Sequence, residues 1–365
     1  MDLLLSNYPP ASLEHSDFVT RWSESFYRAR TMTLATGYFS NDSLLYLLKL
    51  AEMNETKRID VILGMAYFEG VSKSQFEAAT KLNAFLEGEQ TGSLKVVRTF
   101  PFHGKLYSFE SYEGRKTSLV GSSNLSNIVP LRGIEQRNYE VDIEILEDAT
   151  NQKITRFLEV LKDDASVPFD SIATRLTIHA NENPLLNFRS DVERVTSPHL
   201  SGIQEKLAKV SFHIPLKDAP KSNLNVYFGK GRENQQGYVA PRPWYEVEII
   251  VDQATQRSAP NYPENRDFIA YTDDGYRMAM KTSGDYGKNL RSKYDLSILG
   301  RWIKGRLETS GCLKAGESVT DEVLESYGRN HITLTQTSLL ETEILDGEPL
   351  EVWYMDFAPL TREKQ

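Results

Sequence analysis

Four side chains between residues 102 and 140 have types and spacings suited to chemistry on an anion. His103 and Lys105 lie two residues apart, so an extended segment points both side chains to the same face of a strand. Ser122 and Asn124 have the same spacing and add a hydroxyl and a carboxamide. Cleavage of a phosphodiester needs a cationic donor for the non-bridging oxygens, neutral donors to fix them, and a group that attacks phosphorus. The four residues therefore predict a phosphodiester site that contains its own nucleophile.

A simpler interpretation exists for each motif taken alone. The His-x-Lys pair fits a solvated strand face, and Gly-Ser-Ser-Asn fits an ordinary turn. Both motifs occur here in order and at short separation, between strand-like runs, and the run Asn138-Tyr139-Glu140 follows them. Their combination favours a functional site over two unrelated local structures.

The two motifs together resemble the HxK...GSxN signature of the phospholipase D superfamily. The resemblance implies an acidic residue after the lysine, and Glu110 occupies that position where Asp is usual. It also implies a second acidic residue that orients the histidine. Glu140, which follows Asn138, fits that description, and Glu135 is the competing candidate.

The resemblance implies a mechanism without a metal or other cofactor. One histidine attacks phosphorus and forms a phosphohistidine, another protonates the leaving oxygen, and water then reverses the sequence. Lys105 and Asn124 would stabilise the developing charge, and Glu140 would hold the tautomer of His103. The chain has one HxK motif, so the second catalytic histidine is expected from another copy in a twofold homodimer.

Composition places the chain among ordinary globular proteins of two-domain size. It has 365 residues, 40% hydrophobic and 25% charged, with a formal net charge of −9. A single cysteine, Cys312, excludes an intramolecular disulfide and suits a reducing compartment. The first ten residues lack the pattern of a secretion signal, and no run is long enough to span a membrane. We expect a cytoplasmic protein that does not associate with membranes.

The first half of the chain predicts an α/β domain. Strand-like runs and helical runs alternate, which favours a largely parallel sheet with helices on its faces. The expected strands are 31–39, 58–65, 94–99, 117–121 and 139–146. The expected helices are 42–53, one from Ser72 or Ser74 to Leu86, and 148–161. A polar interval with prolines follows, so we assign residues 1–180 to a catalytic and dimerisation domain and 181–200 to a linker.

The second half, residues 201–365, predicts a β-barrel-like domain or a sandwich with small helices. The expected strands are 209–214, 246–251, 267–272, 277–281 and 350–357, and the expected helices are 298–307 and 320–327. Loops 223–243 and 282–297 carry basic and amide side chains between these strands.

Charge is unevenly distributed along this half. Residues 281–306 hold seven Lys or Arg against two acids, whereas the residues after Arg306 hold four basic against twelve acidic. A protein with one edge that faces DNA and an acidic far side has this polarity, although solvated surface charge gives the same pattern. The DNA-binding candidates are Lys230, Arg232, Gln236, Arg242, Lys281, Lys288, Arg291 and Lys293.

Several short motifs in this half resemble the B3-like DNA-recognition domain of the NgoFVII-type restriction endonucleases, which also carry an N-terminal phospholipase D-type domain. The motifs are Gly237-Tyr238-Val239-Ala240-Pro241, Thr272-Asp273-Asp274-Gly275, Ser297-Ile298-Leu299-Gly300 and Tyr327-Gly328-Arg329. The resemblance implies a sequence-specific endonuclease for double-stranded DNA whose two loops grip the major groove. In some relatives a separate ATP-driven translocase takes part; this chain has no phosphate-binding Gly-x-x-x-x-Gly-Lys motif, so any ATP dependence would come from such a partner. A lipid-directed phosphodiesterase and a DNA-binding regulator that does not cleave are the alternatives.

Overall fold

The computed structural model divides the chain into two compact units, and each is described here by itself. Unit 1 comprises the described residues from Met1 to Glu182 together with the segment Arg232–Pro243, and unit 2 comprises those of Asn183–Gly231 and Trp244–Gln365. The residues that the structure describes are 1–7, 11, 17–130, 138–185, 192–233, 237–258, 261–342 and 349–360. Within these ranges, no helix has the length and apolar character needed to cross a bilayer.

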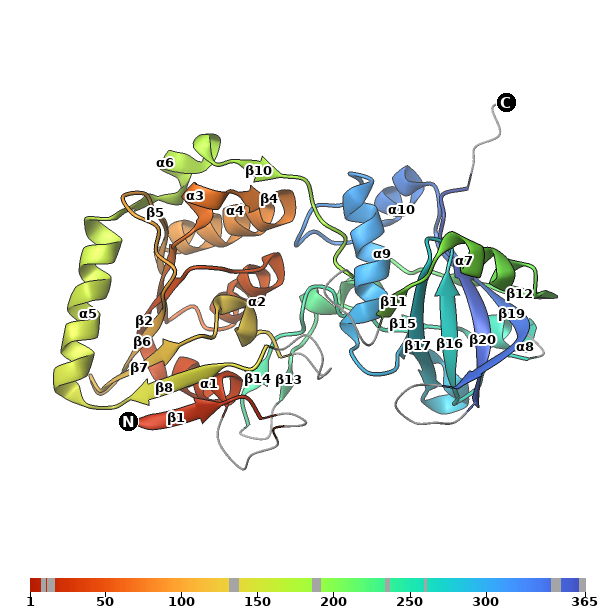
Figure 1. Ribbon diagram of the computed structural model, residues 1–365, viewed down its shortest axis with the longest axis horizontal. Helices are drawn as coiled ribbons and strands as arrows, with labels where there is room; N and C mark the ends of the chain where they lie inside the picture. The colour runs from red at the N-terminus through yellow and green to blue at the C-terminus, as the bar shows by residue number, and fades with distance from the viewer. Residues whose placement is uncertain are drawn as a thin grey trace. The chain divides into compact units, whose positions relative to one another are not determined.

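Unit 1 is built on an eight-stranded sheet with the order β1-β8-β7-β6-β2-β3-β5-β9 (Figure 1). Its strands are β1 Asp2–Leu5, β2 Ala29–Thr36, β3 Arg58–Leu63, β5 Gly92–Val97, β6 Lys105–Ser111, β7 Lys116–Gly121, β8 Val141–Ile145 and β9 Ser166–Pro168. Short elements β4 Val71–Ser72 and β10 Ile178–His179 form a separate parallel pair. The pair β13 Arg232–Glu233 and β14 Val239–Ala240 is antiparallel.

Helices cover both faces of this sheet. Figure 1 shows α5 on one face and α2 and α4 on the other. The helices are α1 Phe18–Arg28, α2 Asn41–Glu52, α3 Ala66–Glu69, α4 Lys73–Gly88, α5 Asp148–Asp163 and α6 Phe169–Ile172, with 3₁₀ turns η1 Leu125–Ile128 and η2 Ala173–Arg175. Ser40 and Ser72 close capping boxes at the starts of α2 and α4, which resolves the predicted choice between Ser72 and Ser74.

The expectation of a largely parallel sheet is wrong for half of unit 1. Strands β2, β3 and β5 are parallel neighbours, as the alternation of strands and helices predicts. Strands β6, β7 and β8 are antiparallel to their neighbours. The reason is connection length, because the short turn between β6 and β7 leaves no room for the crossover that a parallel pair requires.

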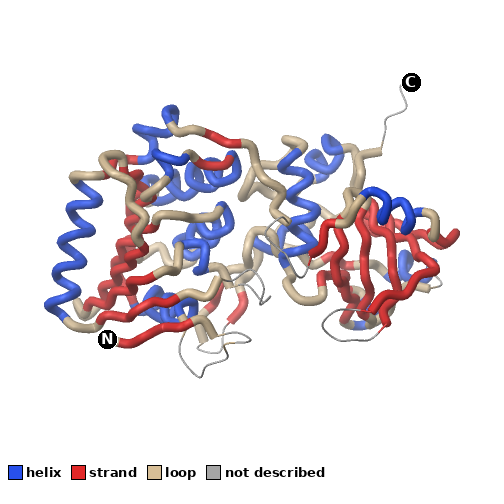
Figure 2. The backbone as a smooth tube through the Cα atoms, viewed as in Figure 1, coloured by secondary structure: helices blue, strands red, loops and turns tan. Residues whose placement is uncertain are grey.

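Unit 2 is dominated by strands (Figure 2). Its sheet has the order β12-β19-β20-β16-β17-β18-β15, and β11 also pairs with β17. Its strands are β11 Val192–Arg194, β12 Leu207–Pro215, β15 Ile249–Ile250, β16 Asp267–Thr272, β17 Tyr276–Ser283, β18 Asn289–Ser292, β19 His331–Thr342 and β20 Pro349–Asp356. Among the described residues the pairings form an open order, so closure into a barrel stays a prediction.

Small helices accompany the sheet of unit 2. They are α7 Ser197–Gln204, α8 Gln253–Ser258, α9 Ser297–Thr309 and α10 Asp321–Tyr327, with 3₁₀ turns η3 Asn223–Phe228 and η4 Asp285–Gly287. The interval assigned to a linker, 181–200, contains β11 and the start of α7, so part of it is regular structure. The division between the units falls after Glu182.

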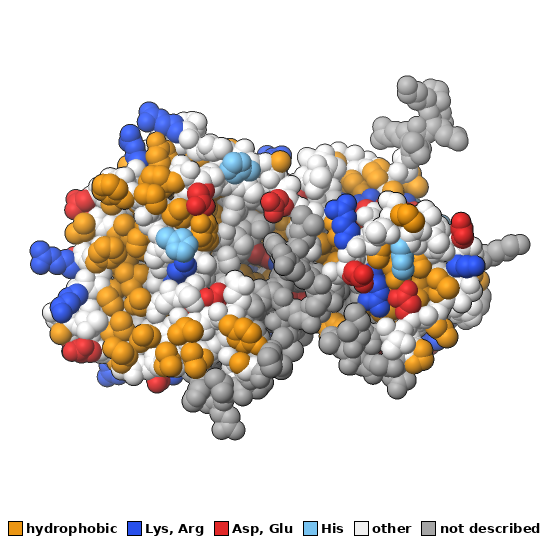
Figure 3. Space-filling model, viewed as in Figure 1, with side chains coloured by type: hydrophobic (Ala, Val, Ile, Leu, Met, Phe, Trp, Pro, Cys, Tyr) orange, Lys and Arg blue, Asp and Glu red, His pale blue; other side chains and the backbone are white. Residues whose placement is uncertain are grey.

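The surface of unit 1 carries exposed apolar side chains, which gather on the face seen in Figure 3. Helix α5 contributes Phe157 and Val160, each 49% exposed, and Phe100 is 79% exposed. Phe102 packs its ring 6.2 Å from that of Phe157. We call Phe100, Phe102, Phe157 and Val160 the apolar patch; it includes the residue next to His103.

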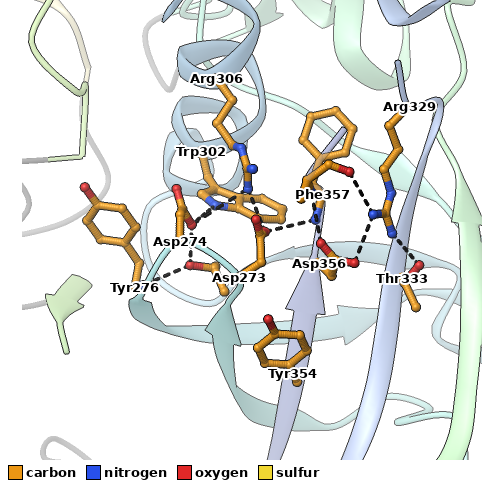
Figure 4. Close-up of polar contacts among 12 residues, drawn as sticks. Asp273, Asp274, Tyr276, Trp302, Arg306, Arg329, Thr333, Tyr354, Asp356 and Phe357 are labelled. Carbon is orange, nitrogen blue, oxygen red and sulfur yellow. Dashed lines mark hydrogen bonds and ion pairs between the residues drawn. The ribbon is translucent and has the colours of Figure 1, made fainter. Parts of the chain in front are cut away.

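In unit 2, Asp273 and Asp274 of the Thr272–Gly275 motif form internal contacts with helix α9 (Figure 4). Arg306 contacts Asp273 at 2.6 Å and Asp274 at 3.8 Å, and Trp302 donates its indole N–H to Asp274 at 2.9 Å. Burial opposes the charge on Arg306, but Asp273 outweighs it, so the pKa of the guanidinium is raised. These acidic side chains therefore tie α9 to the turn between β16 and β17.

The Tyr327–Arg329 motif of unit 2 is also used internally. Arg329 is buried and donates to Asp356 at 2.9 Å and to Thr333 at 2.6 Å (Figure 4). The Tyr327 hydroxyl donates to the carbonyl of Phe357. The glycine of the Ser297–Gly300 motif has a packing role, because a Cβ at Gly300 would lie 1.7 Å from the carbonyl oxygen of Tyr245. All three motifs hold unit 2 together.

Candidate active site

His103 and Lys105 meet at the start of strand β6. His103 is exposed and precedes the strand, whereas Lys105 is its first residue and is buried. The Nζ of Lys105 lies 2.9 Å from the carbonyl oxygen of His103, 3.4 Å from Nδ1 and 3.5 Å from Nε2 of its imidazole. The lysine thus folds back over the histidine, which puts a cationic donor beside a possible nucleophile.

Two glycines let neighbouring strand ends approach this histidine closely. Gly37, just after β2, donates its N–H to the carbonyl of Gly104 at 2.9 Å, and a Cβ there would lie 3.0 Å from the Cα of His103. At Gly64, after β3, a Cβ would lie 1.9 Å from the carbonyl oxygen of Phe102. A larger residue at either position would displace the segment that carries His103.

Glu140 belongs to the same group of side chains. Burial lowers the pKa of Lys105, and the negative charge of Glu140 works against that shift. The carboxylate of Glu140 also accepts a hydrogen bond from the hydroxyl of Ser122. Ser122 in turn accepts the N–H of Val141 at 2.9 Å, so it joins the end of β7 to the start of β8. The role of Glu140 in orienting His103 stays a prediction.

Asn124 is fixed by the segment that follows β2. Its Oδ1 accepts the backbone N–H of Tyr38 at 3.2 Å. Because the carbonyl end of the amide is used in this way, the N–H₂ end is the part that can donate to an anion. The structure therefore gathers Lys105, Ser122, Asn124 and Glu140 around the end of β6 where His103 lies.

A buried pair that the motifs did not predict, Ser123 and Asp142, adjoins this site. Ser123 donates its N–H to Asp142 Oδ1 at 3.1 Å and its hydroxyl to Oδ2 at 2.6 Å. Burial raises the pKa of Asp142 although both hydrogen bonds favour the carboxylate. A Cβ at Gly121 would lie 2.3 Å from Asp142 Oδ1, so only glycine permits this approach. The pair holds the turn that presents Ser122 and Asn124. Because side chains alternate between the two faces of an extended segment, the sequence could have indicated that Ser123, between these two residues, points inward.

The other acidic residue expected near the lysine lies farther along the same strand. Glu110 is near the far end of β6 and its carboxylate is 3.8 Å from Nζ of Lys116, which fits a structural role. Glu135, the competitor of Glu140, lies outside the described residues.

Most of the basic candidates in residues 281–293 have an acidic partner. Lys281 and Lys293 both contact Asp267 at 3.1 Å, and Lys288 contacts Asp285 at 3.0 Å. Arg291 instead contacts neutral groups: the Ser283 hydroxyl at 3.5 Å and the carbonyls of Ser292 and Lys293 at 3.5 and 3.4 Å. These neutral contacts are long, and the role of Arg291 in DNA binding stays a prediction.

The structure divides the other predicted loop, 223–243, between the two units. Lys230 is exposed and belongs to unit 2, whereas Arg232 and Arg242 lie in the segment that packs in unit 1. That segment is fixed to helix α1, because the rings of Tyr27 and Tyr238 stack 4.2 Å apart and the Tyr27 hydroxyl donates to the carbonyl of Val239 at 2.9 Å. Gln236 lies outside the described residues.

No group of three or more His, Cys, Asp and Glu side chains in the described part of the chain is placed to hold a metal ion. That finding leaves open whether the reaction uses a metal, so metal independence stays a prediction.

Comparison with known protein families defines the class of the chain. Residues 15–173 match the model described as the NgoFVII restriction endonuclease N-terminal PLD domain. Residues 202–338 match the model described as the NgoFVII C-terminal B3-like DNA-binding domain. The chain is thus a restriction endonuclease with a phospholipase D-type nuclease domain and a DNA-binding domain. It belongs to the NgoFVII restriction endonuclease family, which confirms the resemblance of the sequence motifs.

Two further comparisons add nothing to this assignment. A search of the curated proteins returned no match. Among solved structures, the chain is similar to the polyphosphate kinase from Porphyromonas gingivalis, with 12% identity and a TM-score of 0.31. That match covers 44% of this chain and 26% of the kinase, and at this TM-score it carries no argument.

Proposed function

We propose that this protein is a sequence-specific endonuclease that hydrolyses DNA phosphodiesters without a metal ion and uses His103 as its nucleophile. The observation that carries the proposal is the contact of the Lys105 ammonium with the His103 imidazole, beside the hydroxyl and amide of Ser122 and Asn124. The histidine nitrogen attacks phosphorus as the bond to the leaving oxygen breaks, and a second histidine donates a proton to that oxygen. Lys105 and Asn124 donate to the non-bridging oxygens, where negative charge develops. Water then attacks the phosphohistidine and releases His103.

The second histidine would come from a second copy of the chain. The remaining histidines in the sequence have no lysine two residues later. The apolar patch supports a homodimer, because exposed apolar side chains next to a site commonly mark a surface that another protein covers. A Phe157→Asp variant should shift the protein toward monomer in sedimentation and lower cleavage with it. Cleavage by a strictly monomeric protein would contradict the composite site.

Double-stranded DNA would be bound mainly by unit 2, through the predicted candidates Lys230, Lys281, Lys288, Arg291 and Lys293. The candidates Arg232 and Arg242 would add contacts from unit 1. A separate ATP-driven translocase is a partner that the same proposal allows, and it would supply any ATP dependence. Addition of ATP to the isolated chain should then leave its cleavage rate unchanged.

The direct test is incubation of the protein with plasmid DNA in EDTA. The wild type should give discrete fragments, and His103→Ala should reduce cleavage by at least about 10³-fold. The matched control is His213→Ala, which removes an exposed histidine of unit 2 and should cleave like the wild type. Intact DNA with a retained gel shift would favour the regulator that does not cleave. Intact DNA with phosphatidylcholine turnover would favour the lipid phosphodiesterase.

A further inference from the structure

We propose that Tyr38 and Glu69 are positioning residues that hold the His103 imidazole in the orientation needed for attack. The inference rests on the proposed function of His103. The ring of Tyr38 lies against that imidazole, with ring centroids 5.2 Å apart and ring planes at 78°. This edge-to-face arrangement is one that aromatic pairs prefer.

The backbone of Tyr38 is fixed to the second motif of the site. Its N–H donates to Asn124, and its carbonyl accepts from the hydroxyl of Thr36 at 2.7 Å. Thr36 also accepts the N–H of Leu125 at 3.2 Å. Replacement of the Tyr38 side chain leaves these backbone contacts available, so the effect of the ring can be measured separately from that of Asn124.

The far end of the Tyr38 side chain is held as well. Its hydroxyl donates to Glu69 Oε1 at 3.1 Å, and this hydrogen bond raises the pKa of the phenol, which keeps its proton at neutral pH. Glu69 is the last residue of α3, and its own carbonyl oxygen lies 2.8 Å from Nε2 of His179 on β10. A tyrosine that is 39% exposed is therefore anchored at both ends.

This anchoring matters because His103 is exposed and precedes its strand. A nucleophile contributes fully only when its attacking atom lies in line with the bond that breaks. Tyr38 restricts the rotation of the imidazole without contacting the DNA in this role. Its loss should therefore lower kcat and leave KM almost unchanged. An aromatic pair of this kind corresponds to a rate effect of up to about tenfold.

Steady-state cleavage of DNA by a set of variants tests the inference. Tyr38→Leu should lower kcat about tenfold, whereas Tyr38→Phe, which keeps the ring, should lower it about threefold. Glu69→Gln still accepts the hydrogen bond and should retain nearly the wild-type kcat. Glu69→Ala should lower kcat by the same factor as Tyr38→Phe. The double variant Tyr38→Phe/Glu69→Ala should be no slower than either single variant, because both changes remove one interaction.

The control is Tyr112→Leu, which removes an exposed tyrosine just after β6 and should cleave like the wild type. A wild-type kcat in Tyr38→Leu would overturn the inference. A raised KM with unchanged kcat in Tyr38→Phe would also overturn it, because the phenol would then be a DNA ligand. Additive effects on kcat in the double variant would show that Glu69 and Tyr38 act independently, which would contradict the proposed pair.

A second readout does not depend on activity. The NMR signals of the His103 ring, assigned by their loss in His103→Ala, should move in Tyr38→Leu and stay nearly in place in Tyr38→Phe. Unchanged His103 signals in Tyr38→Leu would overturn the inference even if the protein cleaves DNA. Absence of His103-dependent cleavage by the wild type would instead contradict the proposed function. The NMR result would still decide whether Tyr38 positions the ring of His103.

Discussion

The motif residues of the two units use their polar atoms in different ways. In unit 1, His103 and Ser122 are exposed, and the Lys105 ammonium contacts the imidazole of His103. In unit 2, Asp273 and Arg306 are half-buried and pair with each other. The motif residues of unit 2 therefore stabilise its fold, whereas those of unit 1 leave polar groups exposed, as the proposed chemistry requires.

This difference indicates where DNA contacts in unit 2 should be sought. The acidic turn and the buried Arg329 are already committed to partners inside the unit. Side chains with weak neutral partners, such as Arg291, are better candidates for binding a nucleic acid. Substitutions in the two units test this difference.

The largest effect on stability is expected from Asp273→Ala. Removal of this carboxylate leaves Arg306 without its closest partner, which should lower the free energy of unfolding of unit 2 by about 3–5 kcal/mol. Urea titration followed by tryptophan fluorescence measures it, since three of the four tryptophans lie in unit 2. The control Asp285→Ala removes an exposed partner of Lys288 and should change stability by less than about 0.5 kcal/mol. A loss below about 1 kcal/mol for Asp273→Ala would contradict a structural role.

The next largest effect is expected from Lys105→Met in unit 1. Methionine fills the buried space but donates no hydrogen bond, so kcat should fall roughly 10²–10³-fold while the protein stays folded. Lys116→Met, which changes a lysine paired with Glu110, is the control and should retain the wild-type rate. Cleavage within a factor of about three of the wild type would show that Lys105 does not stabilise the reacting phosphate.

A smaller effect is expected on DNA affinity. Arg291→Ala should weaken binding of the target by about 1–3 kcal/mol if the guanidinium reads a base. Lys230→Ala and Arg232→Ala should also weaken binding, and gel shifts over a range of salt would separate base contacts from phosphate contacts. Unchanged affinity and salt dependence in all three variants would remove the assignment of these residues to DNA.

The subtlest effect is on the pH profile. Burial lowers the pKa of Lys105, and the charge of Glu140 partly offsets that shift. Since the lysine must be protonated to bind phosphate oxygens, cleavage should decline with rising pH below the range of an exposed lysine. Glu140→Gln removes the offsetting charge and should move this decline to lower pH. A shift in the opposite direction would show that another group controls the alkaline side.

Much of the fold follows from local patterns in the sequence. Helices α2 and α4 begin at serines that cap them, and parallel strands β2, β3 and β5 are separated by those helices. These features depend on residues that are close together in the chain, so they can be predicted from the sequence.

Features that depend on pairing across the sheet were harder to predict. Strand β19, His331–Thr342, was missed because threonine, glutamine and serine interrupt its apolar alternation. The Ser123–Asp142 pair needs the register that sets Gly121 opposite Asp142. Tyr38 reaches His103 only because β2 lies next to β6.

The most direct test of the central claim is a rapid acid-free quench of the wild type during DNA cleavage in EDTA, followed by peptide mapping. The account predicts a covalent DNA adduct on the peptide that contains His103, lost on acid treatment and absent in His103→Ala. Cleavage without any such adduct, or an adduct that survives in His103→Ala, would contradict it.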